Sequence, residues 1–195
     1  MTRLAYLKRQ LAELSLIIEI PYETYYDQFQ ETLSVQLAGE ENIQFDDVKH
    51  LRHHINVSAF LIGFTHFEGF VTDIVKDIYR TELLETGRYA NQITLDKTVD
   101  DLLYAECRDW NRKIAFLKDH FGSMNSFWYT EFLDINKIRN CLIHNNGKAN
   151  YSLKERYADD EEISFTKKDI HDFGDLARSL ASELQLLYDN WSQKI

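Results

Sequence analysis

The sequence predicts an all-α fold, a bundle of about five or six helices with long core helices. One observation is the shortage of turn residues. Proline occurs once and glycine 7 times, where average usage of about 5% and 7% gives roughly 10 and 14. Sandwiches and barrels need frequent turns, so this shortage favours long helices. The other observation is that apolar residues recur at steps of three and four along most of the chain.

The N-terminal 45 residues predict a helical hairpin. An apolar stripe marks the first helix, over residues 3–20, and consists of Leu4, Leu7, Leu11, Leu14 and Ile18. Pro21 then opens a second helix, because the first turn of a helix does not need the N–H that proline lacks. That helix ends near Gly39.

The longest helical signal runs from Val48 to about Leu84. Its apolar positions alternate steps of four and three and are Phe60, Phe64, Phe67, Val71, Ile74 and Ile78. A helix of about 35 residues spans about 50 Å, and Gly87 is a natural stop. We therefore expect this helix to form the centre of the core.

The next segment predicts two shorter helices. Thr98 followed by Asp101 has the spacing of a capping box, in which each residue bonds the backbone N–H of the other, so we expect a helix to open there. A helical pattern over residues 113–120 then continues to Gly122.

The C-terminal third predicts two further helices. Residues 124–146 are helical, and the Asn-Asn-Gly of residues 145–147 is a strong stop signal. A polar loop follows, with a short strand expected over residues 163–165. Thr166 followed by Asp169 then opens a last helix with a capping box. No repeat or linker interrupts the chain, so we expect a single domain over 1–195, made of a hairpin (1–45) and a core bundle (46–195).

Charge and cysteine content narrow the function classes. With 22 Lys and Arg against 32 Asp and Glu, the net charge is −10, and such a chain cannot coat a nucleic acid non-specifically. Cys107 and Cys141 match no disulfide framework or metal spacing, which suits a reducing cytoplasm. The longest uncharged stretch of the first half, 53–67, is too short to span a membrane. His50 and His54 lack further ligands at matching spacing, so we predict no metal and no cofactor.

The stretch that carries chemistry is the end of the helix over 124–146. At 100° per residue, Asn136, Arg139, Asn140 and His144 share an arc opposite an apolar stripe formed by Ile135, Ile138 and Leu142. A guanidinium matches a phosphate with two parallel N–H donors. An imidazole gives and takes protons near pH 7, and the amide can orient the imidazole. This set suits cleavage of RNA by activation of the 2′-hydroxyl, with the second imidazole coming from a second copy.

The segment from Arg139 to His144 resembles the Arg–polar–His motif of the HEPN superfamily of all-α domains. The resemblance implies a metal-independent endoribonuclease, active as a homodimer with a composite site at the interface. It assigns catalytic roles to Arg139 and His144 and a supporting role to Asn140. It also implies a toxin or anti-phage defence effector, restrained by an antitoxin or another regulatory protein.

Basic and polar neighbours suggest further contacts to RNA. Between residues 134 and 156, five basic residues stand against two acidic ones, a local excess of +3. Lys137, Asn145 and Lys148 are the predicted RNA contacts. Glu68 lies beside the apolar stripe of the longest helix, where a carboxylate needs a partner. We predict that Glu68 orients Arg139; the alternative is a pair with another Lys or Arg.

Two other functions fit the same residues. A non-catalytic module can bind RNA, a nucleotide or a protein through this face, and an interaction protein can carry the motif incidentally. In these cases His144 only interacts with the free carbonyls of its helix end, and Arg139 forms a surface ion pair, for example with Asp134.

Overall fold

The computed structural model describes residues 2–19, 48–87, 91–122, 124 and 126–194. Within these ranges the chain forms six α-helices and no strand. The all-α prediction is therefore confirmed. The predicted helix between Pro21 and Gly39 lies outside the described residues. No helix in these ranges is both long enough and apolar enough to cross a membrane.

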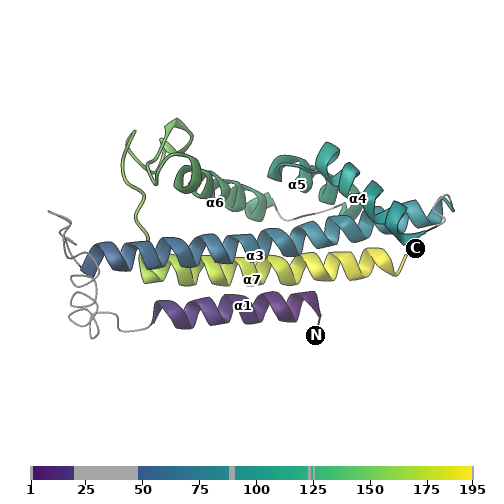
Figure 1. The fold of residues 1–195 in the computed structure, drawn as a ribbon, viewed down its shortest axis with the longest axis horizontal. Coiled ribbons are helices and arrows are strands. Elements are labelled where there is room, and N and C mark those ends of the chain that lie inside the picture. The colour runs from purple at the N-terminus through teal and green to yellow at the C-terminus, as the bar shows by residue number, and fades with distance from the viewer. Residues whose placement is uncertain (1, 20–47, 88–90, 123, 125, 195) are drawn as a thin grey trace, which may run out of the picture.

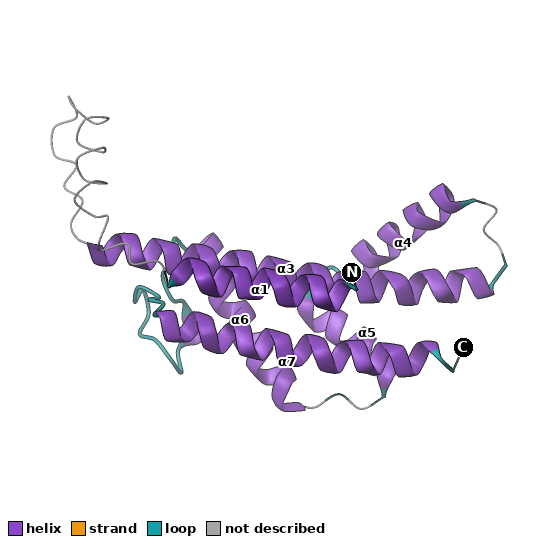
Figure 2. Cartoon of the chain, turned by 90° about the horizontal axis from the view of Figure 1, so that it is seen from below, coloured by secondary structure: helices purple, strands orange, loops and turns teal. Residues whose placement is uncertain are grey.

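Three helices lie side by side along the molecule (Figures 1 and 2). These are α1 (Arg3–Ile18), α3 (Val48–Glu85) and α7 (Lys167–Ser192). Helices α3 and α7 begin at the same end of the molecule, and α1 runs in the opposite direction. The 38 residues of α3 correspond to about 57 Å of helix. This matches the long central helix that the apolar stripe predicts.

The other three helices lie above α3 in Figure 1, on the side away from α1. They are α4 (Gln92–Glu106), α5 (Trp110–Phe121) and α6 (Ser126–His144). Ion pairs tie α4 to α3: Arg80 Nε lies 3.1 Å from Asp96, and Lys76 Nζ lies 2.7 Å from Asp100. Hydrogen bonds from Gln92 and Arg80 lower the pKa of the Asp96 carboxyl.

The predicted capping box at Thr98 is wrong. The cap of α4 is Asn91, seven residues earlier, whose side chain accepts from the N–H of Thr94 at 2.9 Å. Thr98 lies inside the helix, and its hydroxyl donates to the Thr94 carbonyl at 2.9 Å. Asn is a strong N-cap, whereas a Thr in mid-helix satisfies its hydroxyl by bonding back to the preceding turn.

The connection between α6 and α7 holds no strand among its residues, contrary to the prediction for 163–165. Only an isolated bridge pairs Lys148 with Glu162, and a 3₁₀ turn, η2, covers Tyr151–Leu153. Ile163 is fully buried, so its apolar side chain anchors the connection in the core rather than extending a sheet. The capping box of Thr166 and Asp169 is confirmed, with both bonds present.

Four rings join α3, α5 and α6 and form what we call the aromatic cluster: Phe64, Phe67, Trp110 and Phe132. Phe132 of α6 lies 5.5 Å from Phe64, 5.1 Å from Phe67 and 4.3 Å from Trp110, between ring centroids. All four residues are buried. Aromatic pairs at this spacing stabilise a core beyond the area they bury, so the cluster fixes α5 and α6 on α3.

We expect Ile74→Ala to lower the free energy of unfolding by about 2–5 kcal/mol, because the side chain is fully buried and its loss leaves a cavity. Ile93→Ala is the matched control, since Ile93 is 83% exposed, and should change stability by less than about 0.5 kcal/mol. Urea denaturation measures both. Equal effects of the two substitutions would contradict this description of the core.

Candidate functional site

The last turn of α6 ends the helix directly after His144. Asn146 and Gly147 have left-handed backbone, with φ of 52° and 78°. The N–H of Gly147 donates to the Cys141 carbonyl at 3.3 Å. Helices commonly end at a residue with left-handed backbone whose N–H bonds to a carbonyl of the last turn. The predicted end of the helix at Asn-Asn-Gly is therefore confirmed. The imidazole of His144 is left exposed.

Arg139 is held against the aromatic cluster. Its guanidinium carbon lies 5.7 Å from the centroid of the Phe64 ring, within the range of a cation–π interaction. Its Nη1 donates to Oδ1 of Asn140 at 3.0 Å. Asp134, the predicted alternative partner, instead pairs with Lys137 and Arg156. In the part of the chain that the structure describes, the other N–H groups of Arg139 have no hydrogen-bond acceptor.

Asn140 lies between Arg139 and His144 around the helix. Arg139 and His144 are about 140° apart at 100° per residue, with Asn140 inside that arc. The Asn140 side chain is exposed, and its oxygen accepts from Arg139, which leaves the two N–H donors of its amide for another partner. The three predicted residues are thus neighbours, but they do not share one environment: Arg139 is partly buried over Phe64, and the other two are exposed.

Glu68 does not contact Arg139 by any hydrogen bond or ion pair within the described ranges, contrary to the prediction. Its carboxylate lies 3.4 Å from Lys113 Nζ, which also donates to Thr72 Oγ1 at 3.1 Å. Lys113 is 6% exposed and lies 5.0 Å from the Trp110 ring centroid. A buried ammonium needs a carboxylate partner. Glu68 meets that need, as the alternative interpretation of its sequence position expects.

The three predicted RNA contacts differ in availability. Lys137 Nζ lies 2.7 Å from Asp134 and is partly exposed. Asn145 donates from Nδ2 to the Lys148 carbonyl at 3.3 Å, which ties the connection to the end of α6. The side chain of Lys148 is exposed. Lys137 shares a face of α6 with Asn140 and His144, because they lie at i, i+3 and i+7.

Beyond Lys137 this face continues into a cavity of about 310 Å³ between α6 and η2. Tyr151, 75% exposed, stands at the cavity. Lys154 Nζ lies 2.8 Å from the Tyr151 hydroxyl and 4.3 Å from its ring centroid. Lys137 and Arg156 complete the basic lining. Two carboxylates, Asp134 and Glu155, also line the cavity, so its basic excess is one charge. Single-stranded nucleic acids are bound by an exposed aromatic ring, on which a base stacks, next to cations that contact the phosphates.

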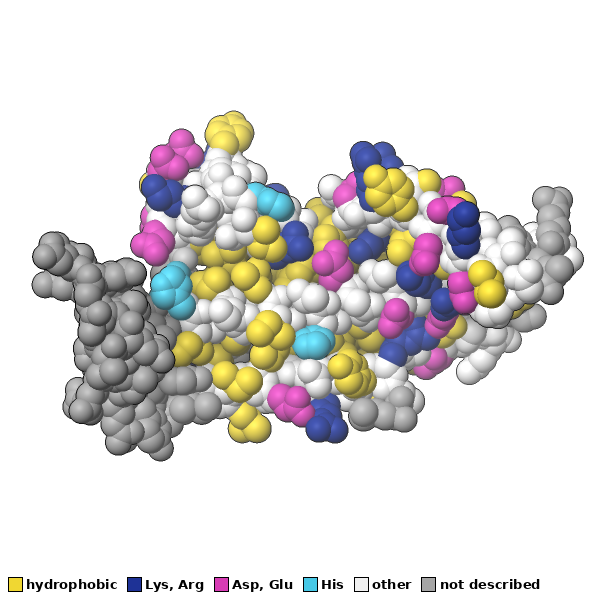
Figure 3. Space-filling view, in the orientation of Figure 1, with side chains coloured by type: hydrophobic (Ala, Val, Ile, Leu, Met, Phe, Trp, Pro, Cys, Tyr) yellow, Lys and Arg dark blue, Asp and Glu magenta, His cyan; other side chains and the backbone are white. Residues whose placement is uncertain are grey.

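The face of the molecule in Figure 3 is hollowed between α6 and the α4–α5 pair, above α3. Hydrophobic side chains form the floor of the hollow, and His and basic side chains stand on its α6 side. Ile143, on the last turn of α6, is 45% exposed. An apolar side chain beside exposed polar residues suits contact with a second chain.

Sequence reasoning missed Lys113 and Tyr151. Lys113 falls on the apolar stripe of α5 with Trp110, Ile114 and Leu117, a position where a charge signals a buried pair. No such signal marks Tyr151, because the residues around it in the sequence do not predict that its ring is exposed.

Among the residues that the structure describes, no three His, Cys, Asp or Glu side chains are grouped so that they could hold a metal ion. No protein-family model, curated protein or solved structure matches the chain. The chemistry of the α6 end therefore rests on its own residues.

We expect a double-mutant cycle of Glu68→Gln and Lys113→Met to give a coupling energy of about 0.5–3 kcal/mol, as contacting charged residues do. The same cycle with Glu68→Gln and Arg139→Met should give coupling within about 0.5 kcal/mol of zero, because the carboxylate touches Lys113 and not Arg139. Urea denaturation of the six proteins measures both. A coupling energy between Glu68 and Arg139 as large as that between Glu68 and Lys113 would instead support the predicted Glu68–Arg139 pair.

Proposed function

We propose that the protein is a metal-independent endoribonuclease of HEPN type. The observation that carries the proposal is the arrangement at the end of α6. The guanidinium of Arg139 is held on the Phe64 ring and bonded to Asn140, and the exposed imidazole of His144 lies one turn from Asn140. A guanidinium that can donate hydrogen bonds to a phosphate, an amide and an imidazole that can transfer a proton are thus neighbours at one helix end.

The proposed reaction attacks the phosphodiester with the neighbouring 2′-hydroxyl of the RNA. A base removes the hydroxyl proton, the 2′-oxygen bonds to phosphorus, and the bond from phosphorus to the 5′-oxygen breaks. The products are a cyclic 2′,3′-phosphate and a 5′-hydroxyl. Arg139 binds the non-bridging oxygens with its remaining N–H donors, where negative charge grows in the transition state.

Proton transfer requires both a base and an acid, and each chain offers the single imidazole of His144 at this position. We propose that two chains pair as a homodimer, so that one imidazole takes the 2′-proton and the other protonates the leaving 5′-oxygen. The exposed Ile143 beside His144 supports contact between chains at this point.

The RNA is proposed to follow the face of α6 that carries His144, Asn140 and Lys137. This face leads to Tyr151, whose exposed ring can stack on a base. Lys148 flanks the path, and Asn145 holds the backbone of Lys148 in place. The path suits a single strand, since stacking on Tyr151 requires an unpaired base.

A second candidate function is a non-catalytic module that binds RNA, a nucleotide or a protein through the same residues. The exposure of Asn140 and His144 favours it, because a single chain leaves them in water, and a catalytic site gains from excluding water. For the catalytic function we propose a cytoplasmic toxin or anti-phage effector, restrained by an antitoxin or another regulatory protein.

We expect the purified protein to cleave RNA in the presence of EDTA between pH 6 and 9. His144→Ala and Arg139→Ala should each lower the cleavage rate by at least about 100-fold, because they remove proton transfer and charge stabilisation. The melting temperature of His144→Ala should change little, because the imidazole is exposed, and Arg139→Ala should lower it by no more than a few degrees, because it also removes the contact with the Phe64 ring. Gel analysis of 5′-labelled RNA measures cleavage, and a cyclic phosphate terminus identifies the reaction.

His54→Ala is the control, since His54 is an exposed histidine of α3 and should leave cleavage unchanged. Saturable RNA binding with no product across this pH range would favour the non-catalytic module. A large loss of stability in His144→Ala would show that the imidazole has a structural role instead.

Tyr151→Ala should weaken binding of single-stranded RNA by roughly tenfold, because a stacked base contributes about 1–3 kcal/mol. Tyr151→Phe keeps the ring and should bind nearly as the native protein does. Tyr104→Ala is a matched control, since Tyr104 is 76% exposed on α4. Fluorescence anisotropy measures the affinities. Equal losses for Tyr151→Ala and Tyr104→Ala would remove Tyr151 from the RNA path.

A further inference from the structure

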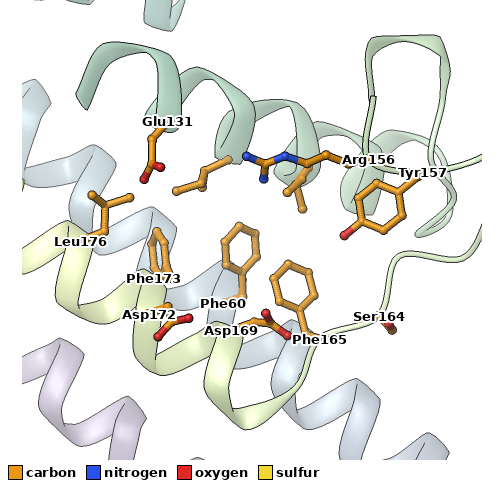
Figure 4. Close-up of a pocket in the computed structure, with 12 residues that line it drawn as sticks. Phe60, Glu131, Arg156, Tyr157, Ser164, Phe165, Asp169, Asp172, Phe173 and Leu176 are labelled. Carbon is orange, nitrogen blue, oxygen red and sulfur yellow. The ribbon is translucent and has the colours of Figure 1, made fainter. Parts of the chain in front are cut away.

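A pocket of about 270 Å³ lies between the first half of α6, the connection and the start of α7 (Figure 4). Three rings form its apolar floor: Phe60, Phe165 and Phe173. Phe60 stacks on Phe165 at 4.7 Å and meets Phe173 edge-on at 5.0 Å, between centroids. The residues that the RNA proposal places in catalysis, Arg139 and His144, do not line this pocket.

The pocket is acidic, with three carboxylates and one guanidinium among its lining residues. Asp169 is engaged, because its carboxylate accepts from the Thr166 N–H at 2.8 Å in the capping box of α7. Asp172 pairs with Lys168. The guanidinium, that of Arg156, lies 3.6 Å from Asp134, outside the pocket. These groups already have partners.

Among the polar groups of the pocket, the Glu131 carboxylate and the Tyr157 hydroxyl have no hydrogen bond or ion pair to any residue within the described ranges; the hydroxyl of Ser164 has none either, but Ser164 is exposed. The side chains of Glu131 and Tyr157 are both partly buried. They lie at opposite ends of the pocket, with the rings between them (Figure 4). A partly buried carboxylate above aromatic rings lacks the cation that would normally offset its desolvation.

We propose that this pocket binds a small organic amine with an apolar, elongated body. The ammonium donates to Glu131, and the body lies on Phe60, Phe165 and Phe173. A hydroxyl or second donor at the far end meets Tyr157. Carboxylate and ring faces both attract a cation, and an acidic lining repels phosphates and carboxylates. The volume is slightly below the range of ordinary ligand pockets, so the ligand is small.

Tyramine and tyrosol test the proposal as a matched pair, because tyrosol has a hydroxyl where tyramine has an ammonium. Titration of the full-length protein, followed by NMR chemical shifts, should show that tyramine binds at least about tenfold tighter, as a charge-assisted hydrogen bond predicts. Glu131→Gln should remove that difference and leave weak binding of both probes.

Glu155→Gln is the control, since Glu155 is an exposed carboxylate of the same connection that does not line the pocket. It should leave tyramine binding unchanged, and the melting temperatures of both variants should match the native protein. Equal affinities for the two probes, tyramine binding that Glu131→Gln leaves unchanged, or no shift at millimolar tyramine would each overturn the proposal. These outcomes do not depend on whether the protein cleaves RNA.

Discussion

The aromatic cluster is the contact on which the rest of the molecule depends. It joins the layer of α5 and α6 to α3 through Phe132 and Trp110. It also carries two cations, Arg139 over Phe64 and Lys113 over Trp110. A guanidinium on a ring face loses freedom without losing its hydrogen-bond donors. The same packing that holds α6 in place therefore orients the residue proposed to bind phosphate.

The start of a helix could be predicted from the sequence where one local signal is stronger than its alternatives. The stripe of α3 predicts a helix from Val48, and the structure begins α3 there. The Thr166–Asp169 box also opens α7 as predicted. Thr98 and Asp101 have the same capping pattern, yet α4 begins at Gln92, because Asn91 caps the helix there and Leu95, in its first turn, is buried. The local capping pattern carries no information about which side chains become buried against another helix.

The neighbours of a charged residue were beyond sequence reasoning. Glu68 and Lys113 are 45 residues apart and meet only because α5 packs across α3. The position of Glu68 beside an apolar stripe indicates that its carboxylate needs a basic partner, but it does not identify that partner. On α6, by contrast, helical periodicity alone places Asn140 between Arg139 and His144. The order of residues around one helix was predictable, whereas the partners of charged residues between helices were not.

The connection between α6 and α7 has two flanks of opposite character, and this separates the two proposed ligands. On one flank Tyr151 lies in a cavity with three basic and two acidic residues, whereas the other flank faces the pocket at Glu131, with three acidic residues and one basic residue. Because the whole chain carries −10, it would repel RNA over most of its surface, and the proposed RNA path therefore follows the flank where basic residues are in excess. The proposed amine would be attracted to the acidic flank for the opposite reason. Arg156 lines both cavities and pairs with Asp134 at 3.6 Å, so one guanidinium forms part of the wall between the two proposed sites.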